Sequence, residues 1–267
     1  MQKRQESIEN DKLVAWLSTS NYPAQQSDHI ERRQKETGLW FLNSPAFRAW
    51  LDEPKGSLFC PGIPGAGKTM IAAVAIDHLL VTKRSSTVGV AYIYHNYKEK
   101  TEQTLGNLLS AVLKQLVQGQ PSMAKLVMPL YEKHTNQGTR PTWSEFYSAI
   151  ESVCASHSTV YIVLDALDEC GHSENTCDEM LDQLRNLQLQ VDVRLMATSR
   201  FIPDIVQRFV GKRTIEVRAS DHDVKRFIEG QIPQLPRCIK KDPALQAMVQ
   251  EKIVEAVDGM KVVLIFL

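Results

Sequence analysis

The spacing of hydrophobic residues changes along the chain, and this change divides it into regions. In residues 57–220, short continuous apolar runs alternate with segments whose apolar residues recur every three or four positions. Continuous runs of this kind are typical of buried parallel strands, and the three-to-four spacing is typical of helices that cover them. The pattern therefore predicts an α/β domain, in which a parallel sheet is flanked by helices on both faces.

Runs rich in β-branched and aromatic residues mark the strands that we expect in this region. They are Ser57–Cys60, Val88–Tyr94, Thr159–Leu164, Val193–Thr198 and Thr214–Val217. Apolar residues at helical spacing mark the expected helices, which cover Met70–Leu80, Leu105–Leu116, Leu126–Tyr131, Phe146–Val153 and Met180–Leu187. Because strands and helices alternate, the strands are predicted to be joined by helical crossovers and to run parallel.

The regions on either side of this domain contain helical patterns without strands. Residues 1–56 are a mostly polar, helical lead-in, in which Ser44 is the expected N-cap of a helix that starts at Pro45. The aromatic residues of this helix are expected to pack on the neighbouring domain. Residues 221–259 predict the start of a small helical subdomain, and residues 260–267 form an apolar tail that fits neither region.

A complete phosphate-binding motif lies between the first expected strand and its helix: glycine, four residues, then Gly-Lys-Thr. The nucleotide-binding residues that it predicts are Gly62, Ile63, Pro64, Gly65, Ala66, Gly67, Lys68 and Thr69. Glycines let successive backbone N–H groups point at phosphate oxygens, and the next helix presents its N-terminus to them. Lys68 would contact the β- and γ-phosphates, and the Thr69 hydroxyl would bind Mg²⁺. The predicted ligand is therefore a nucleoside triphosphate.

Acidic residues follow the clearest strand of the chain. Asp165 ends the apolar run, which places it at the carboxyl edge of the sheet, where ligands of open α/β folds bind. Its carboxylate would complete the Mg²⁺ shell begun by Thr69. Asp168 and Glu169 follow in the expected loop, where a second acid orients or deprotonates a water that attacks the γ-phosphate. Asp165 and Thr69 are thus the predicted metal ligands, and Asp168 and Glu169 are the predicted catalytic acids.

A polar segment also follows the fourth expected strand. From that position Thr198 or Arg200 would reach the γ-phosphate and respond to its presence. An arginine in a surface turn before Pro203 would explain the same residues equally well. The spacing alone does not decide between the two interpretations.

Composition narrows the class of protein further. Among 267 residues, 31 lysines and arginines balance 31 aspartates and glutamates, so no overall field would attract nucleic acid or a membrane surface. The longest apolar run is too short to span a bilayer. Five scattered cysteines do not suggest a disulfide framework or a zinc site, and a cytoplasmic location fits best. Four histidines without metal-ligand spacing are interpreted as surface or hydrogen-bonded residues: His95, His134, His157 and His172.

Together these elements resemble the NACHT family of signal-transducing NTPases, in fungal-type members with a nephrocystin-like N-terminal region. The segments that carry the resemblance are Glu36–Leu42, Ser44–Leu51, Cys60–Thr69, Asp165–Cys170, Ala197–Pro203 and Arg218–Val224. The resemblance implies a STAND-type switch that uses ATP or GTP with Mg²⁺, hydrolyses slowly and has the option of self-association through the NTPase domain. It makes Arg200 the expected catalytic sensor. Because such members continue into winged-helix and repeat regions, the chain is expected to stop before both.

Three hypotheses for function remain open at this stage. A nucleotide switch module uses all of the predicted residues. A non-hydrolysing nucleotide-binding interaction platform would use the same loop without turnover. A small-substrate hydrolase or kinase would need an acceptor pocket and a lid with further basic residues, and the sequence shows no such cluster. Turnover separates the first two, and phosphate transfer to a metabolite would indicate the third.

Overall fold

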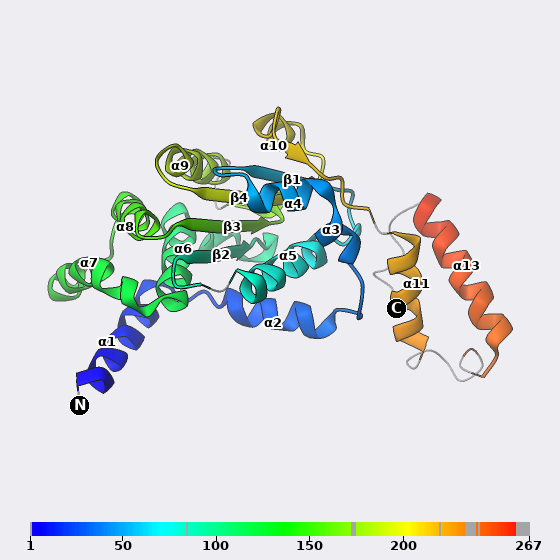
Figure 1. Ribbon diagram of the computed structural model, residues 1–267, viewed down its shortest axis with the longest axis horizontal. Helices are drawn as coiled ribbons and strands as arrows, with labels where there is room; N and C mark the ends of the chain where they lie inside the picture. The colour runs from blue at the N-terminus through cyan, green and yellow to red at the C-terminus, as the bar shows by residue number, and fades with distance from the viewer. Residues whose placement is uncertain are drawn as a thin grey trace.

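A computed structural model of the chain describes residues 2–83, 85–171, 175–218, 220–232, 239 and 241–259. Its centre is a sheet of five parallel strands. The strands are β1 (Ser57–Pro61), β2 (Val88–Tyr94), β3 (Thr159–Asp165), β4 (Val193–Ser199) and β5 (Arg213–Thr214). Their order across the sheet is β2–β3–β4–β1–β5, so β4 separates the strand that leads into the phosphate loop from the strand that ends in Asp165 (Figure 1). The predicted α/β class and parallel sheet are confirmed.

The last predicted strand is shorter than expected. The ladder of β5 ends at Thr214, whereas the apolar pattern predicted a strand through Val217. The backbone nevertheless stays beside β1, because Ile215 N–H donates to the Phe59 carbonyl (2.9 Å) and Val217 N–H donates to the Pro61 carbonyl (2.7 Å). Pairing along β1 therefore continues up to the start of the phosphate loop.

Helices flank the sheet, and each of the five predicted inside residues 57–220 is present. The α-helices are α1 (Gln2–Leu17), α2 (Tyr22–Arg32), α3 (Leu39–Asn43), α4 (Pro45–Asp52), α5 (Lys68–Thr82), α6 (Leu105–Gly119), α7 (Ala124–Gln137), α8 (Trp143–Ala155), α9 (Thr176–Gln190), α10 (Pro203–Arg208), α11 (Asp221–Gln231) and α13 (Pro243–Gly259). Short 3₁₀ helices are η1 (Tyr97–Glu102), η2 (Pro121–Met123) and η3 (Leu167–Glu169). Helix α5 packs on β2, β3 and β4, while α6 packs on β2 and α9 on β4.

Helix α5, which follows the phosphate loop, is covered on several sides. Its residues Ala72–Ile76 are at most 1% exposed, so this part of the helix is buried on all sides. This burial requires a second layer, and α2 of the lead-in supplies it by packing on α5. The side-chain amide of Gln26 on α2 donates to the Ala73 carbonyl (3.0 Å). The lead-in therefore holds the helix whose N-terminus faces the site.

The aromatic helix of the lead-in forms as predicted. Ser44 is its N-cap, with the side-chain oxygen accepting from Phe47 N–H (3.2 Å), and Pro45 is its first residue. Phe47 and Trp50 are completely buried, and the Trp50 ring meets the Tyr161 ring edge-on at a centroid distance of 5.5 Å. The aromatic face of α4 thus packs on the sheet domain, as its spacing indicated.

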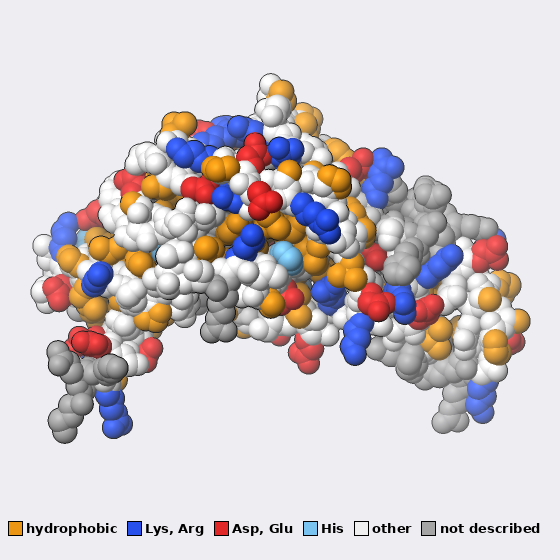
Figure 2. Space-filling view, in the orientation of Figure 1, with side chains coloured by type: hydrophobic (Ala, Val, Ile, Leu, Met, Phe, Trp, Pro, Cys, Tyr) orange, Lys and Arg blue, Asp and Glu red, His pale blue; other side chains and the backbone are white. Residues whose placement is uncertain are grey.

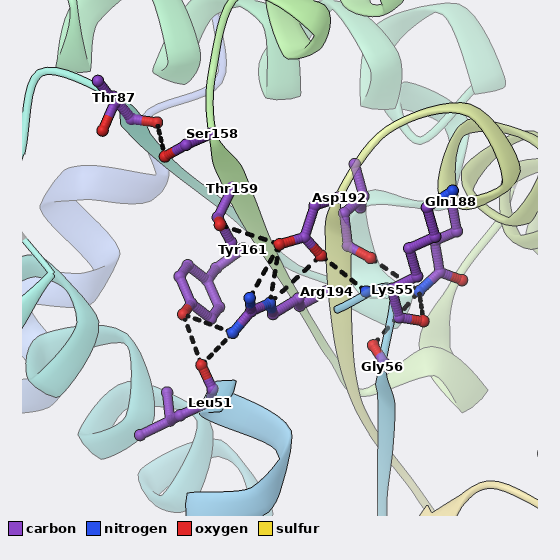
Figure 3. A network of polar contacts seen from close by, with 11 residues as sticks. Leu51, Lys55, Gly56, Thr87, Ser158, Thr159, Tyr161, Gln188, Asp192 and Arg194 are labelled. Atoms are coloured by element: carbon purple, nitrogen blue, oxygen red, sulfur yellow. Dashed lines mark hydrogen bonds and ion pairs between the residues drawn. The ribbon is translucent and has the colours of Figure 1, made fainter. Parts of the chain in front are cut away.

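A polar network joins the end of α4 to the sheet edge opposite the phosphate loop (Figure 3). Arg194, whose side chain is 10% exposed, pairs with Asp192 at 2.8 Å and also donates to the Leu51 carbonyl. The Tyr161 hydroxyl donates to the same carbonyl at 2.9 Å, and Asp192 also accepts from Lys55 N–H at 2.7 Å. These bonds hold the turn from which β1 begins.

The C-terminal helices α11 and α13 lie beside one end of the sheet domain (Figure 1). They pack on each other through Val224, Ile228 and Ile253. The predicted apolar tail, residues 260–267, lies outside the described residues. Within the described part of the chain, no helix is long and apolar enough to cross a bilayer. Basic and acidic side chains are interspersed over the face shown in Figure 2, in keeping with the balanced charge.

Candidate functional site

The phosphate loop begins where β1 ends, and its glycines have distinct roles. Gly62 donates its N–H to the Ser199 carbonyl at 3.0 Å, and a Cβ atom at this position would lie 2.6 Å from the Val217 carbonyl oxygen. Gly65 and Gly67 have φ angles of 74° and 88°, a region that favours glycine. The N–H groups of the first turn of α5 have no partner inside the helix, so they are available to an anion at its N-terminus.

Lys68 lies over the loop that precedes it. Its ammonium group donates to the carbonyls of Gly62 and Ile63, at 2.9 Å each. Burial lowers the pKa of Lys68, while the nearby carboxylates of Asp168 and Asp165 act in the opposite direction. The lysine charge is therefore held at the mouth of the loop, close to the predicted acidic residues.

Asp165, the last residue of β3, forms a buried group with two threonines. The Thr198 hydroxyl donates to Asp165 Oδ1 at 2.6 Å and accepts from Ala166 N–H at 2.9 Å. The Thr69 side chain lies close enough to the Asp165 carboxylate to favour its ionised form. Burial raises the pKa of Asp165 to about 6, although the bond from Thr198, the Thr69 side chain and the charge of Lys68 all act in the opposite direction. The two predicted metal ligands, Thr69 and Asp165, are thus side by side.

The chemistry of this group fits Mg²⁺. The hydroxyl of Thr69 and the carboxylate of Asp165 are oxygen donors, which Mg²⁺ prefers, and Asp165 is only 2% exposed. No cluster of three or more His, Cys, Asp or Glu side chains that would form a complete metal cage exists in the described ranges. Mg²⁺ commonly uses one or two protein ligands and takes the rest from phosphates and water. A raised carboxylate pKa is also what a bound cation would reverse.

Arg200 and Asp168 form an ion pair at the end of β4. Arg200 N–H donates to Asp168 Oδ1 at 2.9 Å, and the guanidinium Nε donates to Oδ2. The Asp168 side chain is 3% exposed, whereas that of Arg200 is 47% exposed. Burial opposes ionisation of Asp168, but the bonds from Arg200 outweigh it and leave the pKa below its usual value. Arg200 therefore contacts the acidic segment that follows β3, and its role toward a phosphate stays a prediction.

Glu169 lies beside this pair but makes different contacts. It is partly exposed, and its Oε2 accepts a bond from Tyr97 N–H at 3.2 Å. We expected Asp168 and Glu169 in a loop, whereas they lie in the short helix η3. The 3₁₀ turn aims consecutive side chains in different directions, so one acid contacts Arg200 and the other contacts the segment after β2.

The environment of His95 differs from our prediction. It was interpreted as a surface or hydrogen-bonded residue, but it is 5% exposed and its Nε2 has no hydrogen-bond partner among the described residues. Its Nδ1 lies 2.6 Å from the Asp165 carbonyl oxygen, and burial lowers its pKa to about 4. The signal was its position directly after β2, because the ends of parallel strands meet at one edge. His134, in contrast, is satisfied by Thr139 and Glu145.

A cavity of about 260 Å³ adjoins the phosphate loop. Its lining comes from the loop, the lead-in and α11, and includes Gly65, Gly67, Thr37, Trp40, Val224 and Phe227. Asp223 links α11 to the lead-in beside the cavity, because its carboxylate accepts from Gly38 N–H (3.0 Å) and from Trp40 Nε1 (3.1 Å). The sequence did not indicate this cavity, since its walls come from segments far apart along the chain.

Solved structures with a similar fold were found at low sequence identity. The ORC1 protein of Aeropyrum pernix, solved in complex with DNA, has a TM-score of 0.51 and 15% identity, over 85% of this chain and 61% of that one. A Walker-type ATPase of Pyrococcus abyssi has a TM-score of 0.47 and 10% identity, over 80% and 60% of the two chains. A DNA replication initiation factor has a TM-score of 0.43 and 14% identity, over 86% and 64%. The chain thus spans less than two thirds of each.

The TM-score of the ORC1 protein supports a common fold, and its 15% sequence identity supports nothing further. The TM-scores of the other two structures are too low to support a conclusion. No curated protein matches the chain in sequence. A family model is more informative. The model described as nephrocystin 3, N-terminal, matches residues 36–200, which cover the second half of the lead-in, the phosphate loop, the acidic segment and Arg200. The match extends over more than half of the chain, and the protein therefore belongs to the nephrocystin 3 N-terminal family.

Proposed function

We propose that this chain binds a nucleoside triphosphate with Mg²⁺ and hydrolyses it slowly, as a STAND-type switch module. The observation that carries the proposal is the convergence of three strand ends. Lys68 begins α5 directly after the loop that follows β1, β3 ends in Asp165, and β4 ends in the segment that pairs Arg200 with Asp168. Phosphoryl transfer needs little beyond positioning and charge compensation, and these groups supply both.

Mg²⁺ would be held by Thr69 and Asp165 and would neutralise charge on the β- and γ-phosphates. The backbone N–H groups of the loop would bind the phosphate oxygens, and the ammonium of Lys68 would exchange its two carbonyl partners for them. Buried Thr198 keeps Asp165 oriented through the bond to Oδ1. The groups that would make these contacts all lie at one edge of the sheet, where the carboxyl ends of the strands meet.

The contacts also support different proposed roles for the two predicted catalytic acids. Both oxygens of Asp168 accept bonds from Arg200, so this carboxylate is occupied in positioning the arginine. Glu169 is partly exposed and has one backbone donor, Tyr97 N–H, on Oε2. A general base needs an oxygen that can accept from water. We therefore place Glu169 at the attacking water and Asp168 behind Arg200.

Arg200 would make the site respond to the γ-phosphate. Its side chain is about half exposed, so an incoming phosphate can compete with Asp168 for the guanidinium. A diphosphate lacks the competing group and would leave the ion pair intact. Reversing a 1:99 population requires roughly 5.5 kcal/mol of differential binding, which several charge-assisted bonds to one phosphate can supply.

The cavity beside the loop is the place that we propose for the base and ribose. It opens next to Gly65 and Gly67, and its walls include Trp40 and Phe227, aromatic side chains suited to a flat ring. Asp223 holds the lead-in and α11 together around it. A nucleotide in this position would contact both outer segments, which links occupancy of the site to their arrangement.

The proposal is tested by binding and turnover measured side by side. Fluorescent ATP and GTP analogues are titrated with Mg²⁺ and with EDTA, and phosphate release is followed over hours. Wild type is compared with Lys68→Ala and with Lys114→Ala, a lysine outside the site that donates to the carbonyls of Ser18 and Ser20. We expect Lys68→Ala alone to lose triphosphate binding, and equal affinity of all three proteins would refute the site.

The same experiment separates the alternatives. Tight binding of triphosphate without phosphate release would refute hydrolysis and support an interaction platform. Light scattering with a triphosphate analogue and with diphosphate tests self-association through the NTPase domain. We expect the larger assembly with the triphosphate form, because Arg200 is released from Asp168 only there.

A further inference from the structure

The structure brings together two cysteines that are seven residues apart in the sequence. Cys170 directly follows Glu169 at the end of η3, and Cys177 is the second residue of α9. The Cys170 backbone N–H donates to the Leu167 carbonyl at 3.1 Å, and the Cys177 thiol lies 3.8 Å from the same oxygen. The two thiols are also neighbours, because each shifts the pKa of the other. We expected scattered cysteines, and the turn after β3 makes these two neighbours.

We propose that Cys170 and Cys177 are a peroxide-sensitive thiol pair that forms an intramolecular disulfide. This modification site does not depend on the proposed nucleotide chemistry. Both side chains are partly exposed, so a small oxidant can reach them. Cys60 and Cys154, in contrast, are buried and provide internal controls. A disulfide between these neighbouring thiols would bring their sulfurs to the covalent distance of about 2.05 Å.

The surroundings assign different roles to the two sulfurs. Cys177 lies in the first turn of a fifteen-residue helix, where the N-terminal dipole favours a thiolate. The neighbouring Cys170 thiol lowers the pKa of Cys177, and the charge of Arg208 acts in the same direction. The Cys177 thiol and burial raise the pKa of Cys170. Cys177 is therefore the attacking thiolate, and Cys170 is the resolving thiol.

The reaction balances with hydrogen peroxide as the oxidant. The Cys177 thiolate attacks one peroxide oxygen, the O–O bond breaks, and the sulfur becomes a sulfenic acid as hydroxide leaves and takes up a proton. The Cys170 sulfur then attacks Cys177 Sγ, the S–O bond breaks, and a second water leaves. Two thiols lose two electrons and two protons, and one peroxide becomes two waters. A dithiol reductant reverses the bond.

The consequence for the fold is a covalent tether at the acidic segment. A Cys170–Cys177 bond would join the residue after Glu169 to the start of α9. Because Glu169 and Cys170 are adjacent, closing the sulfur–sulfur distance moves the backbone that carries the acid. Oxidation would thus act beside Glu169, the residue that we place at the attacking water, and not on the phosphate loop.

The test is a peptide map of the full chain after a short exposure to stoichiometric hydrogen peroxide. Cys238 lies outside the described residues and is replaced by serine in every sample. Cleavage after glutamate cuts the chain after Glu169, Glu174 and Glu179, so a disulfide joins the peptides 170–174 and 175–179. We expect this joined pair, 2 Da below the sum of its reduced parts, and its loss after dithiothreitol.

Two matched variants check the assignment of roles. In Cys170→Ser, a sulfenic acid should persist on Cys177 and be trapped by dimedone. In Cys177→Ser, Cys170 should remain a free thiol under the same exposure. Absence of the joined peptides in the Cys238→Ser protein, or oxidation of Cys60 and Cys154 at the same peroxide dose, would overturn the proposal. Because the readout is covalent mass, failure of nucleotide binding does not affect it.

Discussion

Replacing Asp165 with asparagine should stabilise the fold while it disables the site. Asp165 is 2% exposed, and burial raises its pKa from 3.8 to about 6. Each pH unit of difference between the folded and unfolded pKa corresponds to 1.36 kcal/mol, so the ionised carboxylate destabilises the folded state by about 3 kcal/mol at neutral pH. Asparagine has nearly the same shape and keeps an oxygen for the Thr198 hydroxyl, without the charge.

The stability difference between Asp165→Asn and wild type should depend on pH, in a direction set by the raised pKa of Asp165. Between pH 4 and 6 the folded wild-type protein binds more protons at this position than the unfolded chain, because its pKa is the higher one. Wild-type stability therefore decreases as pH rises through this window, relative to the variant. We expect Asp165→Asn to match wild type near pH 4 and to exceed it by about 1–3 kcal/mol above pH 7.

Urea unfolding followed by circular dichroism measures this difference at several pH values, in EDTA and without nucleotide. Asp204→Asn, which removes an exposed carboxylate from α10, is the matched control and should show little change. A variant less stable than wild type at pH 7.5, or an advantage that does not vary with pH, would refute the account of Asp165 as an electrostatically strained ligand. The same variant should lose Mg²⁺-dependent turnover.

Three further changes test other parts of the molecule. Lys68→Ala should weaken triphosphate binding by roughly a hundredfold, through the loss of charge-assisted bonds, without altering the thermal unfolding midpoint; equilibrium titration measures the first and circular dichroism the second. Glu169→Gln should lower turnover by about 10²–10⁴-fold and change affinity little, and phosphate release measures it. Asp192→Asn should remove about 3 kcal/mol of stability by leaving the Arg194 guanidinium buried without its carboxylate, with nucleotide affinity unchanged; a stability loss below about 1 kcal/mol in urea unfolding would contradict this.

Most of the fold could be predicted because it depends on local patterns. Continuous apolar runs predicted β2 with the correct ends, and β1, β3 and β4 to within one residue. The cap at Ser44 and the phosphate loop are likewise short-range features with characteristic residues. The last strand was overestimated, because Ile215 and Val217 pair with β1 by hydrogen bonds without continuing a regular ladder. Strand order was not predicted, since hydrophobic spacing carries no information on which strands are neighbours.

The sequence placed the candidate site residues near one another but did not predict their contacts. Asp165 and Thr69 were expected to be neighbours and are, because Asp165 ends β3 and Thr69 lies in the first turn of α5, at the same edge of the sheet. The pairing of Arg200 with Asp168 was not foreseen, since it depends on the turn of η3 and on rotamers that the sequence does not specify. The role of Arg200 toward a γ-phosphate stays a prediction. Burial of His95 was missed because a histidine after a strand is as compatible with solvent as with the core.

The position of β4 explains how the parts of the site are connected. Since β4 lies between β1 and β3, a group that joins the phosphate loop to the acidic segment has to come from its end. Residues Thr198–Arg200 contact three different parts in succession: the first bonds Asp165, the second holds Gly62 N–H, and the third pairs with Asp168. A ligand that draws Arg200 away from Asp168 therefore acts on a backbone that also holds the loop and the metal ligand. If Arg200 senses the γ-phosphate as proposed, sensing and binding would be coupled through these three consecutive residues, and no longer pathway between them would be required.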